Sequence, residues 1–392
     1  MARADTLLPH GLDEASPPDL WLDDSALIPA GAFGGEREAA WGRLAAHASE
    51  PNVFGEAWTV RAAVGALDAR DQVTIAWVTD ARGDALGALP LARGRAYGRL
   101  VIAHTTNWSH ANAFAGTPIV RAGSEAAFWR RLLALLDKSD WPGFLHLTGL
   151  NEDGPVLAGL RTVAAERRLP LSVVHRAERA LLSSDLSPDE YWAANVRKKK
   201  RKELARLANR LADEGAVACT RLGERDSADE WVGSFLALES AGWKGRAGSA
   251  MACAPGTDAV FRATIVGAHA RRRLHALTVS LNDRPIAMLA TLLAPPGAFS
   301  YKIAYDEAFA RFSPGVLIER HALSLLDEPG IEWVDSCAAP DHPMIDSLWA
   351  ERRAIVRVTL PLAGRRRRAV HDLTRLAERG WTAARRLTGA PA

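Results

Sequence analysis

Residues 299–317 read FSYKIAYDEAFARFSPGVL, a stretch that passes from a strand pattern into the start of a helix. The alternation from Phe299 to Tyr305 is typical of a β-strand. Pro314 suits the first turn of a helix, and Gly315 lets a ligand approach the backbone closely. Because a helix start also presents unpaired N–H groups and a positive dipole end, the stretch predicts a pyrophosphate site. An ordinary helix cap would give the same pattern.

Two groups of candidate site residues follow from this stretch. Lys302, Tyr305 and Asp306 stand at the end of the strand, where a hydroxyl and a carboxylate beside a phosphate loop could move protons during acyl transfer. Alternatively, Asp306 simply caps the next loop. The predicted phosphate-binding residues are Arg311, Phe312, Ser313, Pro314, Gly315, Val316 and Leu317.

The same order of elements occurs twice along the chain: a hairpin, a third strand, a helix and a closing strand. The first half shows strands near 73–78, 86–91, 100–103 and 144–147, with a helix at 124–138. The second half shows strands near 274–281, 286–293, 299–305 and 333–335, with a helix at 314–326. No residue-level repeat is visible, so a shared architecture is inferred from element order alone.

A long helix is predicted between the halves. Ser187 and Glu190 have the spacing of a capping box, and Gly215 supplies the stop. Within this helix, residues 197–202 are six consecutive basic residues. They fit either a solvated helix face or a surface that binds the phosphates of a nucleotide, a lipid headgroup or tRNA.

Two further clusters are candidates for binding the acceptor. Trp243, Lys244 and Gly245 form a bend that could line a pocket, although a Trp after an apolar helix is often a core anchor. Trp108 and His110 follow the third strand of the first half, the place that the Ser-Pro-Gly loop occupies in the second. We therefore expect them on the acceptor side. The sequence contains no metal-binding motif.

Length and composition limit the function classes. The 392 residues suit two domains, and the three cysteines form neither a disulfide framework nor a zinc motif. The net charge is +3, but residues 364–392 alone contribute +6, which leaves a slightly acidic body and argues against a general nucleic-acid binder. With no spanning segment or secretory signal recognised, we expect a cytoplasmic protein, peripheral to the inner membrane if its basic amphipathic tail docks there.

The sequence resembles the FemAB-like, BioF2-type branch of the GNAT acyltransferases, whose members are commonly labelled CelD/BcsL-type acetyltransferases of cellulose biosynthesis. The resemblance covers roughly residues 50–360. It rests on the basic helix ending at Gly215, on residues 238–245 (LESAGWKG) and on the stretch from Lys302 to Leu317. The usual GNAT phosphate loop is here reduced to Ser-Pro-Gly.

The resemblance implies an α/β (α+β) fold of two tandem GNAT-like domains, each a mixed, mostly antiparallel sheet flanked by helices. The expected divisions are a loosely ordered segment 1–50, domains at 51–180 and 181–363, and the tail 364–392. It also implies acyl transfer from acyl-CoA or acetyl-CoA, without a metal, to an amine or hydroxyl of a sugar, lipid or small molecule. Ser313, Pro314 and Gly315 would hold the donor, while Tyr305 and Asp306 would handle protons and Lys302 or a backbone N–H would stabilise the oxyanion.

Two other functions remain open at this point. The related Fem branch uses aminoacyl-tRNA, and the basic run 197–202 could bind that RNA. Alternatively, the chain is a non-catalytic GNAT-like module that docks at a membrane through its tail.

Overall fold

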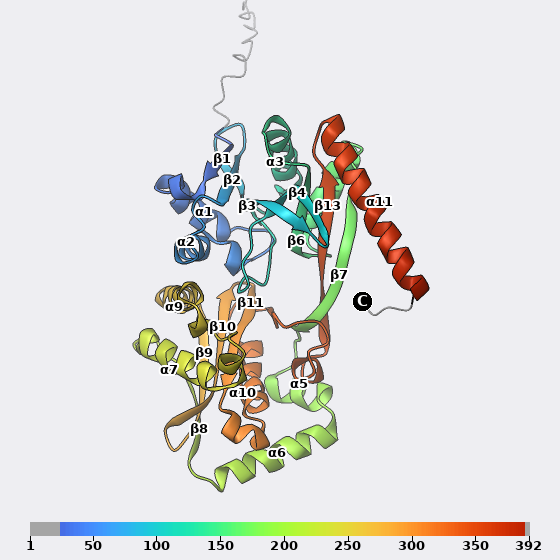
Figure 1. The fold of residues 1–392 in the computed structure, drawn as a ribbon. Helices are drawn as coiled ribbons and strands as arrows, with labels where there is room; N and C mark the ends of the chain where they lie inside the picture. The colour runs from blue at the N-terminus through green and yellow to red at the C-terminus, as the bar shows by residue number, and fades with distance from the viewer. Residues whose placement is uncertain (1–23, 389–392) are drawn as a thin grey trace, which may run out of the picture.

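The computed structural model describes residues 24–388, and their strands form one continuous, mostly antiparallel sheet (Figure 1). The strand order is β1-β2-β3-β4-β6-β13-β7-β12-β11-β10-β9-β8, and β5 pairs with β3. The strands of the first half are β1 (Ala26–Pro29), β2 (Val73–Thr79), β3 (Ala85–Tyr97), β4 (Leu100–Asn107), β5 (Ile119–Val120), β6 (Phe144–Asn151) and β7 (Ser172–Leu182). Those of the second are β8 (Val217–Arg221), β9 (Leu274–Leu281), β10 (Arg284–Ala294), β11 (Gly297–Tyr305), β12 (Trp333–Asp335) and β13 (Glu351–Pro361).

Helices cover this sheet, and their apolar faces supply its core. The α-helices are α1 (Glu36–Ala45), α2 (Ala57–Ala66), α3 (Glu125–Lys138), α4 (Pro155–Glu166), α5 (Pro188–Asn195), α6 (Lys198–Ala212), α7 (Ala228–Ala241), α8 (Trp243–Arg246), α9 (Pro255–Ala270), α10 (Pro314–Ala322) and α11 (Arg365–Thr388). Short 3₁₀ helices are η1 (Ala30–Ala32), η2 (Val53–Gly55), η3 (Met251–Cys253), η4 (Glu307–Phe312), η5 (Leu323–Asp327) and η6 (Ile345–Ser347). No helix within residues 24–388 combines the length and apolarity that crossing a bilayer requires.

The predicted fold class is confirmed, and the duplicated element order is visible in the sheet. Each half contains a hairpin followed by a third strand that pairs in parallel with the strand after its helix, namely β4 with β6 and β11 with β12. All other strand pairs among the described residues are antiparallel. β13 then returns from the second half and lies between β6 and β7, so the two halves share strands.

Three sequence-based expectations need correction. The segment 1–50 was expected to be loosely ordered, but residues 26–45 form β1, η1 and α1, where Trp41 is buried; residues 1–23 lie outside the described part. The predicted single helix from Ser187 to Gly215 is two helices, because Val196 is extended and buried between α5 and α6. The predicted helix 314–326 is α-helical only to Ala322 and then continues as η5.

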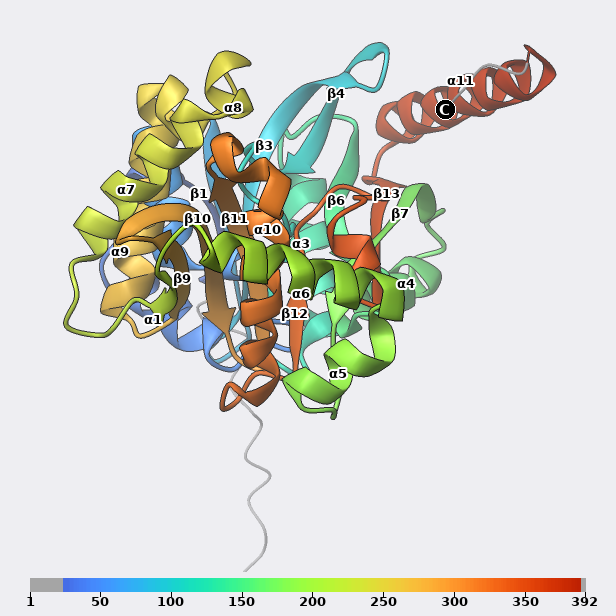
Figure 2. The same ribbon diagram turned by 90° about the horizontal axis from the view of Figure 1, so that it is seen from below.

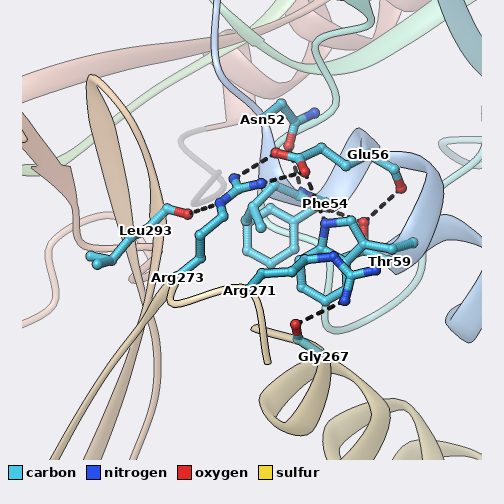
Figure 3. A network of polar contacts seen from close by, with 10 residues as sticks. Asn52, Phe54, Glu56, Thr59, Gly267, Arg271, Arg273 and Leu293 are labelled. Atoms are coloured by element: carbon cyan, nitrogen blue, oxygen red, sulfur yellow. Dashed lines mark hydrogen bonds and ion pairs between the residues drawn. The ribbon is translucent and has the colours of Figure 1, made fainter. Parts of the chain in front are cut away.

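The two halves meet at a seam closed by polar and apolar contacts (Figure 3). Arg273, the residue before β9, donates to both carboxylate oxygens of Glu56 at 2.6 Å and to the Leu293 carbonyl at 2.6 Å. Phe54 from the first half packs edge-on against Phe299 of β11, with ring centroids 5.4 Å apart. Because both contacts join segments more than 200 residues apart, the seam fixes how the first half faces β11.

Candidate functional site

The site begins where β11 and β12 separate. β12 pairs with β11 only from Gly297 to Phe299, whereas β10 pairs with β11 along its length. Residues 300–305 of β11 therefore have no strand partner on the side away from β10, within the described chain. An unpaired strand edge inside a sheet leaves backbone groups available to other partners.

The first such partner is Lys244, at the start of the second half's α8. Its Nζ donates to the Ile303 carbonyl at 3.0 Å and to Glu239 Oε1 at 2.9 Å. The other Glu239 oxygen accepts the Met251 N–H at 2.8 Å. Glu239 is 4% exposed, so its charge is stabilised by these partners rather than by water.

Glu239 is a site residue that the sequence reasoning missed. It follows Trp231 and Phe235 at four-residue steps on the buried face of α7. A carboxylate on an apolar helix face has to find a buried partner. That pattern was the signal that could have identified it.

Lys302 lies on the part of β11 that has separated from β12, close to Lys244 and Glu239. Its Nζ is 5.2 Å from the centroid of the Phe114 ring and 5.8 Å from that of Tyr301. Burial, with the nearby Lys244 charge, lowers the pKa of Lys302 to about 8. An ammonium held against two aromatic faces with a depressed pKa is a strong local hydrogen-bond donor at neutral pH.

The loop after β4 brings the first half to the same place. Burial and the Lys302 charge lower the pKa of His110 to about 4, so its imidazole is neutral at pH 7. His110 Nδ1 accepts the Asn112 N–H at 3.4 Å, which leaves Nε2 as the protonated nitrogen. The Trp108 ring lies 5.5 Å from the His110 ring. The structure therefore brings Lys302, Lys244, Trp108 and His110 to one seam.

Trp243 and Gly245, the other two residues of the predicted bend, have different structural roles from Lys244. Trp243 is 54% exposed, so it is not the core anchor of the alternative interpretation, and its backbone N–H donates to Glu307 Oε1 at 2.5 Å. A Cβ on Gly245 would stand 1.8 Å from the Ser240 carbonyl oxygen. Packing alone therefore requires glycine at position 245.

The end of β11 leads into the predicted phosphate loop. Asp306 caps η4 by accepting the Ala308 N–H at 2.9 Å, and its other oxygen pairs with Arg284. Both oxygens thus have structural partners, which argues against Asp306 as the proton acceptor. Tyr305 lies against Gly315, and its hydroxyl forms no hydrogen bond with the described residues.

The start of α10 offers one free backbone N–H. Ser313 is left-handed, with φ 54°, and its carbonyl accepts from Val316 and Leu317. The Gly315 N–H has no acceptor within residues 24–388, and Pro314 has no N–H to offer. Arg311 instead pairs with Glu214 at 3.0 Å and stacks on Phe312, which is buried. Of the seven predicted phosphate-binding residues, Gly315 is the one at the start of α10 whose backbone N–H is free, because the N–H groups of Ser313, Val316 and Leu317 are bonded to carbonyls within the described chain.

No group of three or more metal-ligating side chains occurs in the described part of the chain. Around the end of β11, the described residues offer the half-buried Lys302 ammonium, the Tyr305 hydroxyl and the start of α10.

Comparison with known proteins bears on the fold. Residues 198–342 match the family model described as an acetyltransferase (GNAT) domain. The chain is similar to the crystal structure of FemX, with 10% identity, a TM-score of 0.55, and coverage of 87% of this chain and 98% of FemX. No curated protein matches the sequence.

Two other solved structures share the fold. The C-terminal domain of a putative lysylphosphatidylglycerol synthetase from Agrobacterium fabrum is 12% identical, with a TM-score of 0.52, covering 86% of this chain and 95% of that one. The structure of L-PGS from Bacillus licheniformis is 10% identical, also with a TM-score of 0.52, covering 88% and 96%. At these identities the likeness establishes a shared fold, and the family model over residues 198–342 describes it as GNAT-like.

Proposed function

We propose that this chain is an acyltransferase of the GNAT type that moves an acyl group from acyl-CoA to an amine or hydroxyl. One observation carries the proposal: half-buried Lys302 lies on the part of β11 that has separated from β12, and the same strand ends beside Gly315, whose N–H is free. That spacing would let one strand hold both ends of a donor, the pyrophosphate at α10 and the thioester carbonyl near Lys302.

In the proposed reaction, Lys302 donates to the carbonyl oxygen as negative charge develops on it. The acceptor attacks the carbonyl, and the Tyr305 hydroxyl protonates the departing thiolate. The proton released by the acceptor restores the Tyr305 hydroxyl, so the cycle closes without a separate carboxylate base. Trp108 and His110 would line the acceptor side, while Lys244 and Glu239 hold the open edge in place.

The donor assignment is tested by thermal shift with acetyl-CoA, a longer acyl-CoA and free coenzyme A. A donor at 100 times its Kd should stabilise the fold by about 2.7 kcal/mol. Gly315→Asp, which places a carboxylate at the predicted pyrophosphate site, should abolish the shift. Gly42→Asp on exposed α1 is the matched control and should keep it. Absence of any shift with all three compounds would remove the acyl-CoA proposal.

One observation favours a second candidate, transfer from an aminoacyl-tRNA. The basic run 197–202 lies at the N-terminal end of α6, with no acidic residue in its first turn (Figure 2). Like charges at the positive end of a helix dipole are destabilising unless an anion binds there. In this case tRNA binding should be salt-sensitive and weakened by Lys199→Glu with Lys202→Glu, but not by Arg43→Glu with Arg82→Glu.

The proposed acceptor class is a sugar, a lipid or a small molecule of polysaccharide or envelope biosynthesis. Its support is the resemblance of residues 238–245 and 302–317 to the CelD/BcsL-type enzymes. Product analysis with candidate amines and sugars, once a donor is identified, tests this part separately.

A further inference from the structure

The C-terminal helix α11 has its faces reversed relative to an ordinary surface helix. His371 and Thr374 are 1% and 2% exposed, whereas Leu373 and Leu376 are 67% and 66% exposed. Val370, one turn before, is also exposed. A surface helix normally buries its apolar stripe and exposes its polar one. On α11 the polar stripe faces the protein and the apolar stripe faces outward.

Specific contacts fix this orientation. The Arg367 guanidinium donates to the carbonyls of Leu136 and Asp137 at 3.3 and 3.2 Å. The His371 ring lies 5.6 Å from that of Phe144, and its Nε2 is 3.4 Å from Thr359 Oγ1. These partners belong to α3, β6 and β13, so the helix is held at three places by its polar side. The C-terminal end of the helix extends clear of the sheet (Figure 2).

Arginines flank the outward apolar stripe. Arg365, Arg366, Arg368 and Arg379 are exposed, and none forms an ion pair or side-chain hydrogen bond with the described residues. Asp372 is the one exposed acid between residues 365 and 380. Exposed leucines bordered by unpaired arginines are the pattern of a helix that lies in the interface of an anionic bilayer.

We propose that α11 docks this protein on a membrane surface that contains anionic phospholipids. The leucines would enter the boundary between headgroups and acyl chains, and the arginines would contact lipid phosphates. Charge decides between this occupant and a second copy of the chain, because a second α11 would bring another row of arginines against the first. Lipid headgroups supply the opposite charge. This inference is independent of the proposed transferase activity.

The test is co-sedimentation of the full-length protein with vesicles. We expect binding to vesicles of phosphatidylcholine mixed with phosphatidylglycerol, weakened by salt, and little binding to phosphatidylcholine alone. Leu373→Asp with Leu376→Asp should lower the partition coefficient tenfold or more. Because both side chains are exposed, the melting temperature should not change. Val217→Asp, on exposed β8 at the far edge of the sheet, is the matched control and should bind like the parent.

A second pair of variants tests the contribution of the arginines to vesicle binding. Arg368→Glu with Arg379→Glu should weaken binding to the anionic vesicles at least tenfold, whereas Arg43→Glu with Arg82→Glu, far from α11, should not. Parent-like binding by the leucine variant, or no binding to anionic vesicles, overturns the proposal. A dimer in sedimentation equilibrium that the leucine variant dissociates, without vesicle binding, would assign the stripe to a second copy instead.

Discussion

Lys302 is the residue on which the proposed chemistry depends most. Lys302→Met removes the donor to the developing oxyanion and should lower turnover by about 10²–10³-fold. The melting temperature should not fall, because the substitution removes a half-buried cation that forms no hydrogen bond or ion pair with the described residues. Steady-state kinetics and thermal unfolding of the two proteins check this. Parent-like turnover in the variant would remove Lys302 from the reaction.

The depressed pKa of Lys302 also predicts how activity responds to pH. Its charged form is the donor, so kcat/KM should fall as pH rises through about 8, where the ammonium loses its proton. Lys302→Arg keeps the charge above that pH, so any activity it retains should lack this falling limb. Measured pH profiles of both proteins decide the matter. An identical falling limb in both would mean that another group titrates there.

A substitution at Asp306 tests whether this residue has a catalytic or a structural role. Both its oxygens are engaged, one by Ala308 N–H and one by Arg284, and Asn would keep the capping acceptor. We therefore expect Asp306→Asn to retain turnover within about threefold and to lower stability by less than about 1 kcal/mol. A large loss of turnover with an unchanged melting temperature would instead restore the sequence-based assignment as proton acceptor.

At the scale of elements, patterns among neighbouring residues predicted individual strands and helices, whereas the pairing of strands distant in the sequence was not predicted. The alternation in 299–305 and the Ser-Pro-Gly turn predicted β11 and the start of α10 correctly, because both depend on neighbouring residues. β13 was missed, since its charged residues obscure the alternation and its partners β6 and β7 lie about 200 residues earlier. The approach of Lys244 and Glu239 to β11 likewise depends on packing between elements.

Helix α10 carries a buried carboxyl that should make the stability of the fold pH-dependent. Glu319 is 3% exposed, its Oε2 has no hydrogen-bond partner, and burial raises its pKa from 4.5 to about 8. Between these values the folded chain keeps a proton that the unfolded chain releases. The free energy of unfolding should therefore fall as pH rises from about 4.5 to about 8, by up to about 1.4 kcal/mol per pH unit.

Glu319→Gln should flatten this dependence, because the amide stays neutral. Urea unfolding at several pH values between 5 and 8 checks it. The same substitution at exposed Glu332 is the control and should leave the slope unchanged. A slope in Glu319→Gln equal to that of the parent would show that the carboxyl is ionised, or partnered, in the folded protein.

At the scale of the whole molecule, the seam determines whether the halves behave as one unit. Glu56 is 6% exposed and receives two hydrogen bonds from Arg273, which reaches it from the other half (Figure 3). Arg273→Met leaves that carboxylate buried without its cation, which typically costs about 3–5 kcal/mol. β7 of the first half pairs with β12 and β13 of the second, so the two halves belong to one sheet. The loss of stability should therefore appear as one shifted unfolding transition rather than as a separate melting of one half.

The neighbouring residue supplies the control for this prediction. Arg272 pairs with Glu224, but both side chains are largely exposed, at 76% and 65%, so Arg272→Met should cost less than about 1 kcal/mol. If the proposed site is built from both halves, Arg273→Met should also lower turnover at temperatures where the chain stays folded, because His110 and Phe114 face Lys302 across this seam. Equal effects of the two substitutions on unfolding and turnover would mean that the seam does not set the geometry at β11.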